Sequence, residues 1–203
     1  MINLPNILTI SRIGVIPILV GTFYLDEPLG NWLGLAILTL AGATDFFDGF
    51  VARAWHQQSQ LGKFLDPVAD KLLVSALLFM LLGFGRIPGL AILPAVVILC
   101  REILVSGLRE FLADLHVSVP VSRLAQWKTT LQMIALGFLI VGAAGPDFGP
   151  LSTTDIGVAG LWLAALLTLI TGYDYLRAGL HHVDRLDSIE AGEKKKDTAS
   201  DQG

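Results

Sequence analysis

Four aspartates that lie close together in the sequence could carry out chemistry. They form two pairs, Asp45 with Asp48 at spacing i,i+3 and Asp66 with Asp70 at spacing i,i+4. Residues at these spacings share one face of a helix. Carboxylates are costly in or near a membrane, and both pairs border very apolar segments, so we interpret them as a functional site. Four carboxylates repel one another unless a cation lies between them, and oxygen ligands favour Mg²⁺ or Mn²⁺. Such ions bind phosphates, so the pattern indicates metal-dependent phosphoryl-type transfer at a membrane surface.

The elements that position these residues are predicted to be membrane helices. The chain has 203 residues, of which 53% are hydrophobic and 16% are charged, and several apolar runs are long enough to span a membrane. We predict an all-α integral membrane protein with six transmembrane helices, whose spans lie near residues 7–25, 29–47, 67–84, 90–112, 129–144 and 156–175. The second helix continues to Trp55, a polar loop covers residues 56–62, and the third helix has Pro67 in its first turn. We assign residues 1–186 to the membrane catalytic domain and residues 187–203 to a disordered cytoplasmic tail.

The positions of lysine and arginine predict the orientation. Of the 14 basic residues, only Arg86 lies in a turn that we assign to the outer side, and the other 13 lie on the opposite side. The positive-inside rule makes that opposite side cytoplasmic. An even number of spans then places both termini in the cytoplasm and the acidic stretch at the cytoplasmic face of the inner cell membrane. No basic region or cleavage site precedes Asp26, so we expect no cleaved signal peptide.

The acidic stretch has a specific spacing. It reads D-x2-D-G-x2-A-R-x8-G-x3-D-x3-D, and its fixed positions are Asp45, Asp48, Gly49, Ala52, Arg53, Gly62, Asp66 and Asp70. This pattern resembles the signature of the CDP-alcohol phosphatidyltransferases. The resemblance implies a six-helix membrane fold, a homodimer, and two divalent ions that are held by the four aspartates and bind the diphosphate of CDP.

The residues of the pattern have chemistry that suits these implied roles. All four aspartates are expected to be metal ligands, and Asp70 is also expected to be the general base that takes the alcohol proton. The metal polarises the diphosphate and stabilises CMP as it leaves, while the alcohol attacks the phosphorus that bears the lipid. The nucleotide is expected to contact Asp48, Gly49, Ala52, Arg53 and Gly62. The small residues allow close approach, and the forked charge of Arg53 suits a diphosphate.

The acceptor alcohol depends on residues outside this stretch. Four further segments resemble the glycerol-3-phosphate branch of the family: residues 3–12, 66–71, 101–111 and 128–133. The resemblance implies CDP-diacylglycerol and glycerol 3-phosphate as substrates, and phosphatidylglycerophosphate and CMP as products. A dianionic phosphate requires a basic pocket, for which Arg101, Arg109 and Lys128 are the candidates. One departure is Gln126, which stands where the family often has a basic residue and leaves Lys128 to act with other cations.

Several alternatives stay open at this point. The acceptor could instead be inositol phosphate, serine or phosphatidylglycerol, and the acidic pairs could belong to a salt-bridge network, an intramembrane prenyltransferase or an ion-coupled carrier. A carrier predicts acids near mid-span and a repeated broken-helix pattern, neither of which is visible. Each of the three candidate phosphate-binding residues also has an alternative role. Arg109 could be a snorkelling side chain at the membrane interface, Arg101 could pair with Glu102 or Asp70, and Lys128 could be a cytoplasmic anchor. Arg12 could contact a lipid phosphate. Membrane lipids are expected partners, and no nucleic acid is expected.

Overall fold

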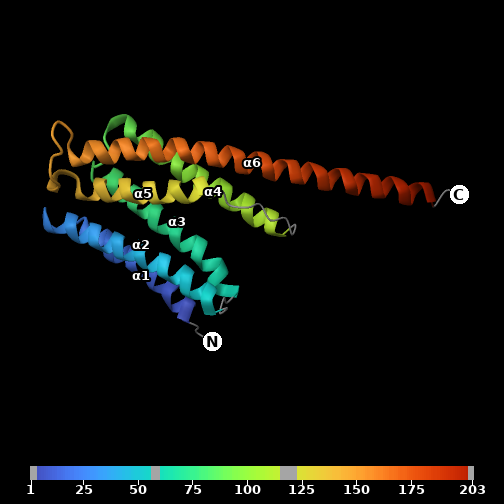
Figure 1. Cartoon of the computed structure of the whole chain (residues 1–203), viewed down its shortest axis with the longest axis horizontal. Coiled ribbons are helices and arrows are strands. Elements are labelled where there is room, and N and C mark those ends of the chain that lie inside the picture. The colour runs from blue at the N-terminus through green and yellow to red at the C-terminus, as the bar shows by residue number, and fades with distance from the viewer. Residues whose placement is uncertain (1–3, 56–59, 115–122, 201–203) are drawn as a thin grey trace.

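Six α-helices make up the part of the chain that the computed structural model describes, which is the backbone of residues 4–55, 60–114 and 123–200. Within these ranges, the side chains of residues 11–44, 65, 68–113, 127–177 and 179 are described. The helices, labelled in Figure 1, are α1 (Leu4–Thr22), α2 (Leu29–Trp55), α3 (Gln60–Gly83), α4 (Ile92–Asp114), α5 (Arg123–Val141) and α6 (Thr153–Ser200). Short 3-10 turns, η1 (Gly89–Ala91) and η2 (Gly142–Ala144), precede α4 and follow α5. The prediction of an all-helical fold is confirmed for these ranges, which contain no strand.

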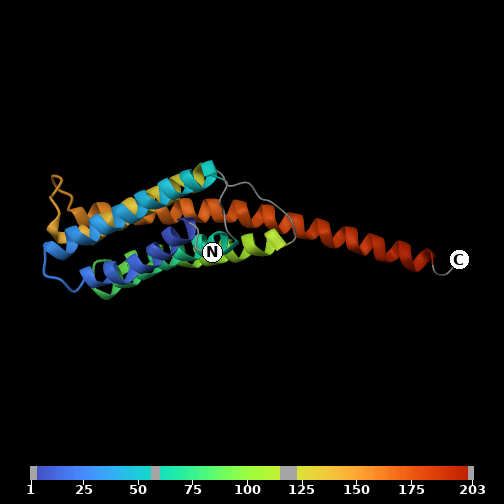
Figure 2. The same cartoon turned by 90° about the horizontal axis from the view of Figure 1, so that it is seen from below.

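The helices run back and forth between two ends of the molecule. Figures 1 and 2 show the turns from α1 to α2, from α3 to α4 and from α5 to α6 gathered at one end. The far ends of α2 and α4 and the start of α3 lie toward the other end, and α6 projects well past them. α6 packs along both α5 and α4, while α3 packs along α1. This up-and-down arrangement places the second half of α2 and the first half of α3 at the same end.

Apolar helices of membrane-spanning length are present. Among the described residues, three helices are long and apolar enough to cross a bilayer, namely Gly89–Ala113, Trp127–Ala144 and Thr153–Arg177, and two shorter apolar helices cover Ser11–Thr22 and Leu29–Thr44. Large hydrophobic side chains such as Phe79, Ile103 and Leu169 are exposed on the outer faces of the helices. Lipid tails are as apolar as these side chains, so this surface suits a membrane and not water.

The helices meet over a core of fully buried aliphatic side chains, including Leu81 on α3, Leu139 on α5 and Leu161 on α6. A small residue allows one close contact in this core. A Cβ at Gly34 of α2 would lie only 2.9 Å from Cγ2 of Ile140 on α5. Small residues at helix interfaces let backbones approach in this way, which is typical of membrane helix packing.

A polar network ties the helices together at the end where the three turns gather. The guanidinium of Arg86 donates hydrogen bonds to Oδ1 of Asn31 at 2.6 Å, to Oε1 of Glu27 at 3.0 Å and to the backbone carbonyl of Ile140. Asn31 is buried and donates to the carbonyl of Val141 at 3.0 Å. Burial lowers the pKa of Arg86, and the Glu27 carboxylate opposes that shift. The network joins α2, the α3–α4 turn and the end of α5.

Two helix starts differ from the sequence prediction. α3 begins at Gln60 and passes through Pro67, so Gly62 lies in a helix and not in the predicted loop. A proline inside a helix removes one backbone hydrogen bond and crowds the carbonyl four residues earlier, but membrane helices tolerate proline where neighbouring groups satisfy the freed carbonyl. α1 begins at Leu4, which puts Pro5 in the first turn, where its missing N–H is not needed.

The division of the chain into a membrane domain over residues 1–186 and a disordered tail over residues 187–203 stays a prediction. The backbone of α6 runs as a helix to Ser200. The sequence places Glu190 four residues before Lys194. A glutamate four residues before a lysine favours a helix, so the sequence of this segment is compatible with a helical backbone.

Candidate active site

The two acidic pairs lie on consecutive helices. Asp45 and Asp48 belong to the second half of α2, and Asp66 and Asp70 belong to the first half of α3. The helical spacing that was predicted for each pair is therefore present in the backbone. The side chains of the other motif residues fall outside the described set, which holds for Asp45, Asp48, Gly49, Ala52, Arg53, Gly62 and Asp66.

Asp70 is the motif carboxylate whose side chain is described. It is 55% exposed, and its Oδ1 accepts a hydrogen bond from a terminal nitrogen of Arg12 at 3.0 Å. Arg12 is only 5% exposed, so α1 supplies a buried cation to the proposed general base. A buried charge requires a partner of opposite sign. The sequence alone had suggested a lipid phosphate for Arg12, and the pairing with Asp70 is an additional contact.

The donor chemistry of this region fits a divalent ion. Carboxylate oxygens are the ligands that Mg²⁺ prefers, and Asp70 offers a carboxylate that is more than half exposed. Among the described side chains, no three His, Cys, Asp or Glu residues gather into one group. Asp70 is the one motif aspartate among these side chains, so the proposed ligand set is a prediction from the sequence and the helix placement.

A second charged cluster lies on α4 and α5. Nζ of Lys128 forms an ion pair with Oε1 of Glu102, and the same oxygen lies 3.7 Å from a terminal nitrogen of Arg101. The side chain of Lys128 is 3% exposed and that of Arg101 is 14% exposed. The contact of Arg101 with Glu102 was one of the open alternatives, but the carboxylate is shared with Lys128. Two cations from different helices are thus held together by one anion.

Arg109 lies on the same helix as Arg101, two turns further along. It is exposed, and its guanidinium carbon lies 5.7 Å from the centre of the Tyr175 ring on α6. Such a cation–π contact holds an arginine against an aromatic face. Arg101 and Arg109 thus lie on α4, and Lys128 lies on α5, joined to α4 by its ion pair with Glu102.

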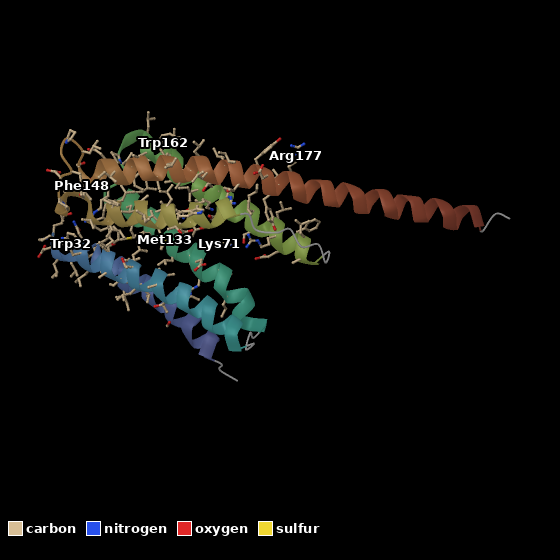
Figure 3. The ribbon with its side chains drawn as sticks, in the orientation of Figure 1. Trp32, Lys71, Met133, Phe148, Trp162 and Arg177 are labelled. Carbon is tan, nitrogen blue, oxygen red and sulfur yellow. The ribbon has the colours of Figure 1, made fainter. Side chains whose placement is uncertain are left out.

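One contact links the acidic helix to the basic helix. Nζ of Lys71, the residue after Asp70, donates a hydrogen bond to Oγ of Ser106. Ser106 lies on α4 between Arg101 and Arg109. Figure 3 shows Lys71 in the middle of the molecule, away from the end that carries Trp32 and Phe148. The contact places the proposed base and the proposed phosphate-binding residues on adjoining helices.

Several residues of this region had no predicted role in the site. Glu102, Ser106, Thr171 and Tyr175 all contact a predicted site residue or its neighbour. Only Glu102 carried a signal in the sequence, because a carboxylate inside an apolar span requires a partner. The serine, threonine and tyrosine are ordinary residues of membrane helices, and only the fold reveals their contacts.

Comparison with known proteins places this arrangement in a family. The sequence profile of the CDP-alcohol phosphatidyltransferases matches residues 2–170. A Rickettsia bellii protein named CDP-diacylglycerol–glycerol-3-phosphate 3-phosphatidyltransferase is 51% identical over 87% of this chain and 94% of its own. Proteins of the same name from Cereibacter sphaeroides and Arabidopsis thaliana, the latter numbered 2, are 36% and 38% identical, over 89% and 87% of this chain and 97% and 79% of their own. This chain belongs to the CDP-alcohol phosphatidyltransferase family.

Proposed function

We propose that this protein transfers the phosphatidyl group of CDP-diacylglycerol to glycerol 3-phosphate, giving phosphatidylglycerophosphate and CMP. The names of the relatives support this reaction. The observation that supports an acceptor with a phosphate group is the pair of cations Arg101 and Lys128, largely shielded from solvent, on helices that contact α3. A dianionic phosphate is the natural ligand of two desolvated cations, whereas serine has no such group.

In this proposal, the acceptor phosphate is held by Arg101, Arg109 and Lys128. Its sn-1 hydroxyl then lies within reach of Asp70, which takes the hydroxyl proton as general base. The alcohol oxygen forms a bond to the phosphorus that bears the diacylglycerol. The bond between that phosphorus and the CMP oxygen breaks, and CMP leaves with the electron pair. Arg12 holds the Asp70 carboxylate in place.

The donor site is proposed from the motif. Asp45, Asp48, Asp66 and Asp70 would hold one or two divalent ions, Mg²⁺ or Mn²⁺. When bound, such ions neutralise the diphosphate and lower the barrier to its cleavage. The cytidine diphosphate would lie along Asp48, Gly49, Ala52, Arg53 and Gly62, where small residues leave room beside the helices.

The membrane arrangement is part of the same proposal. We infer six spans, both termini in the cytoplasm and a site that faces the cytoplasm of the inner cell membrane. The helices that are apolar but shorter than a full span, such as Leu29–Thr44, would complete their crossing with the polar motif residues at the cytoplasmic end. We also propose a homodimer, as the family resemblance implies.

The test uses the purified full-length chain in detergent with Mg²⁺, CDP-diacylglycerol and radiolabelled glycerol 3-phosphate. We expect labelled lipid and CMP in equal amounts, and no product after EDTA treatment until Mg²⁺ or Mn²⁺ is restored. Asp70→Asn is expected to lower kcat by about 100-fold or more, because it removes the general base. Absence of labelled lipid from the wild-type protein would refute the reaction. Competition with serine, inositol phosphate and phosphatidylglycerol identifies any other acceptor, and CMP release separates an enzyme from a carrier.

A further inference from the structure

The side chain of Arg101 is held by α6 as well as by Glu102. One terminal nitrogen of its guanidinium donates a hydrogen bond to Oγ1 of Thr171 at 3.3 Å. The other terminal nitrogen lies on the Glu102 side. Thr171 is 5% exposed, so this contact is shielded within the helices. The guanidinium is thereby fixed between α4 and α6.

The hydroxyl of Thr171 is oriented to accept this hydrogen bond. Its own proton is donated to the backbone carbonyl of Leu167, one turn earlier on α6, at 2.8 Å. A threonine hydroxyl has one proton and two acceptor lone pairs. Because the backbone carbonyl takes the proton, the lone pairs remain for the guanidinium of Arg101.

The next residue, Gly172, makes room for the arginine. A Cβ at this position would lie 3.0 Å from Cγ and 3.2 Å from Nε of Arg101. The stem of Arg101 therefore lies against the bare backbone of α6. Glycine is unfavourable inside a helix, and this close approach gives the position a physical reason.

We propose that Thr171 and Gly172 are positioning residues, which hold Arg101 where it meets the phosphate of the acceptor. This inference rests on the proposed function, because it takes Arg101 to contact the acceptor. A long arginine side chain loses rotamer freedom when it binds a ligand. A side chain that is already fixed by a hydroxyl and a helix backbone loses less, so the acceptor binds more tightly.

The chain contains a matched control for Thr171. Thr168 lies one turn earlier on α6 and is fully buried, and its Oγ1 has no hydrogen-bond partner among the described residues. A change from threonine to valine at either site exchanges a hydroxyl for a methyl group of similar size. Only the change at position 171 removes an acceptor from Arg101.

The experiment compares the kinetics of Thr171→Val, Thr171→Ser and Thr168→Val in the full-length protein. We expect Thr171→Val to raise the KM for glycerol 3-phosphate about tenfold, with kcat and the KM for CDP-diacylglycerol unchanged, because a hydrogen bond to a charged group is lost. Thr171→Ser keeps the hydroxyl and is expected to stay near the wild-type KM. Thr168→Val is expected to change it less than about twofold.

A double-variant cycle tests whether the effect passes through Arg101. In an Arg101→Ala background, Thr171→Val is expected to cause no further rise in the acceptor KM, because the two residues act as one unit. Gly172→Ala is expected to raise the same KM by displacing the arginine. An equal effect of the valine changes at 171 and 168, or an undiminished effect in the Arg101→Ala background, would overturn the inference. A wild-type protein that makes no lipid product refutes the proposed function itself, which is a different outcome.

Discussion

At the scale of single residues, the carboxylate of Glu102 determines how much positive charge the basic cluster presents. It faces Lys128 and Arg101 with the same oxygen. Without it, two poorly solvated cations would repel each other across the interface of α4 and α5. With it, the cluster still carries an excess of positive charge, to which Arg109 adds. An incoming dianion can therefore bind without displacing the internal anion.

The substitution Glu102→Gln tests this arrangement. Removal of one partner from a partly buried ion pair leaves the other charges uncompensated, so we expect the free energy of unfolding to fall by about 1–3 kcal/mol. Thermal unfolding in detergent measures the loss. Inorganic phosphate is expected to stabilise the variant more than the wild type, because it replaces the missing anion. Glu110→Gln, an exposed carboxylate on the same helix, serves as the control and is expected to change stability by less than about 0.5 kcal/mol.

At the scale of helices, polar contacts join neighbouring helices at two positions along the length of the molecule. The Arg86 network joins α2, the α3–α4 turn and α5 at one end. Lys71 and Ser106 join α3 to α4 near the middle. α3, which carries Asp66 and Asp70, is thus connected to its neighbours by polar contacts at two heights. The far half of α2, with Asp45 and Asp48, lies beyond the level of the Arg86 network.

The Arg86 network can be tested without altering the proposed site. Arg86→Ala leaves the buried Asn31 without its guanidinium donor, so we expect a loss of about 2–4 kcal/mol of stability. The KM values and the kcat of the folded fraction are expected to stay at wild-type levels, because the network lies at the far end of α3 from Asp70. Glu27→Gln is the milder comparison. Glu27 is 56% exposed, and an exposed ion pair contributes less than about 1 kcal/mol. A large change in either KM with Arg86→Ala would contradict this separation.

The sequence predicted the helices well and the contacts between them poorly. Apolar runs of membrane-spanning length predicted the helices, and the acidic motif identified Asp70 as a candidate site residue. The start of α3 was misplaced because Pro67 was interpreted as lying in the first turn of the helix, whereas α3 begins at Gln60. The links from Asn31 to Val141 and from Arg101 to Thr171 join residues 110 and 70 positions apart. No local pattern encodes contacts at such separations, because they depend on how the helices pack.

At the scale of the whole molecule, charge and polarity are distributed unevenly along the helices. The three turns that gather at one end of the molecule carry one arginine, Arg86, which is paired with Glu27. The remaining basic residues belong to the other end or to the charged clusters within the helices. This asymmetry is the reason for the proposed orientation.

Labelling of single cysteines tests that orientation. In a Cys100→Ser background, Asp147→Cys in the α5–α6 turn is expected to react with a membrane-impermeant maleimide added to intact cells. Asp187→Cys is expected to react only after the membrane is permeabilised. Positions 147 and 187 lie on either side of the proposed sixth span, so labelling of both from outside would contradict an even number of spans with cytoplasmic ends.

The position of Arg101 along α4 has a consequence for how the two substrates meet. Arg101 follows Ile92, the first residue of α4, by nine positions, which is about 14 Å of helix. The hydrocarbon layer is about 30 Å thick. If the proposed fourth span enters this layer at Ile92, the backbone of Arg101 would lie inside the layer and not at its cytoplasmic edge. In the proposed reaction, glycerol 3-phosphate from the cytosol would have to reach that depth, while CDP-diacylglycerol would arrive laterally within its own leaflet. Selection among alcohols would then begin before the acceptor reaches Asp70. Only an anionic acceptor would gain enough electrostatic free energy from Arg101 and Lys128 to offset the loss of its hydration.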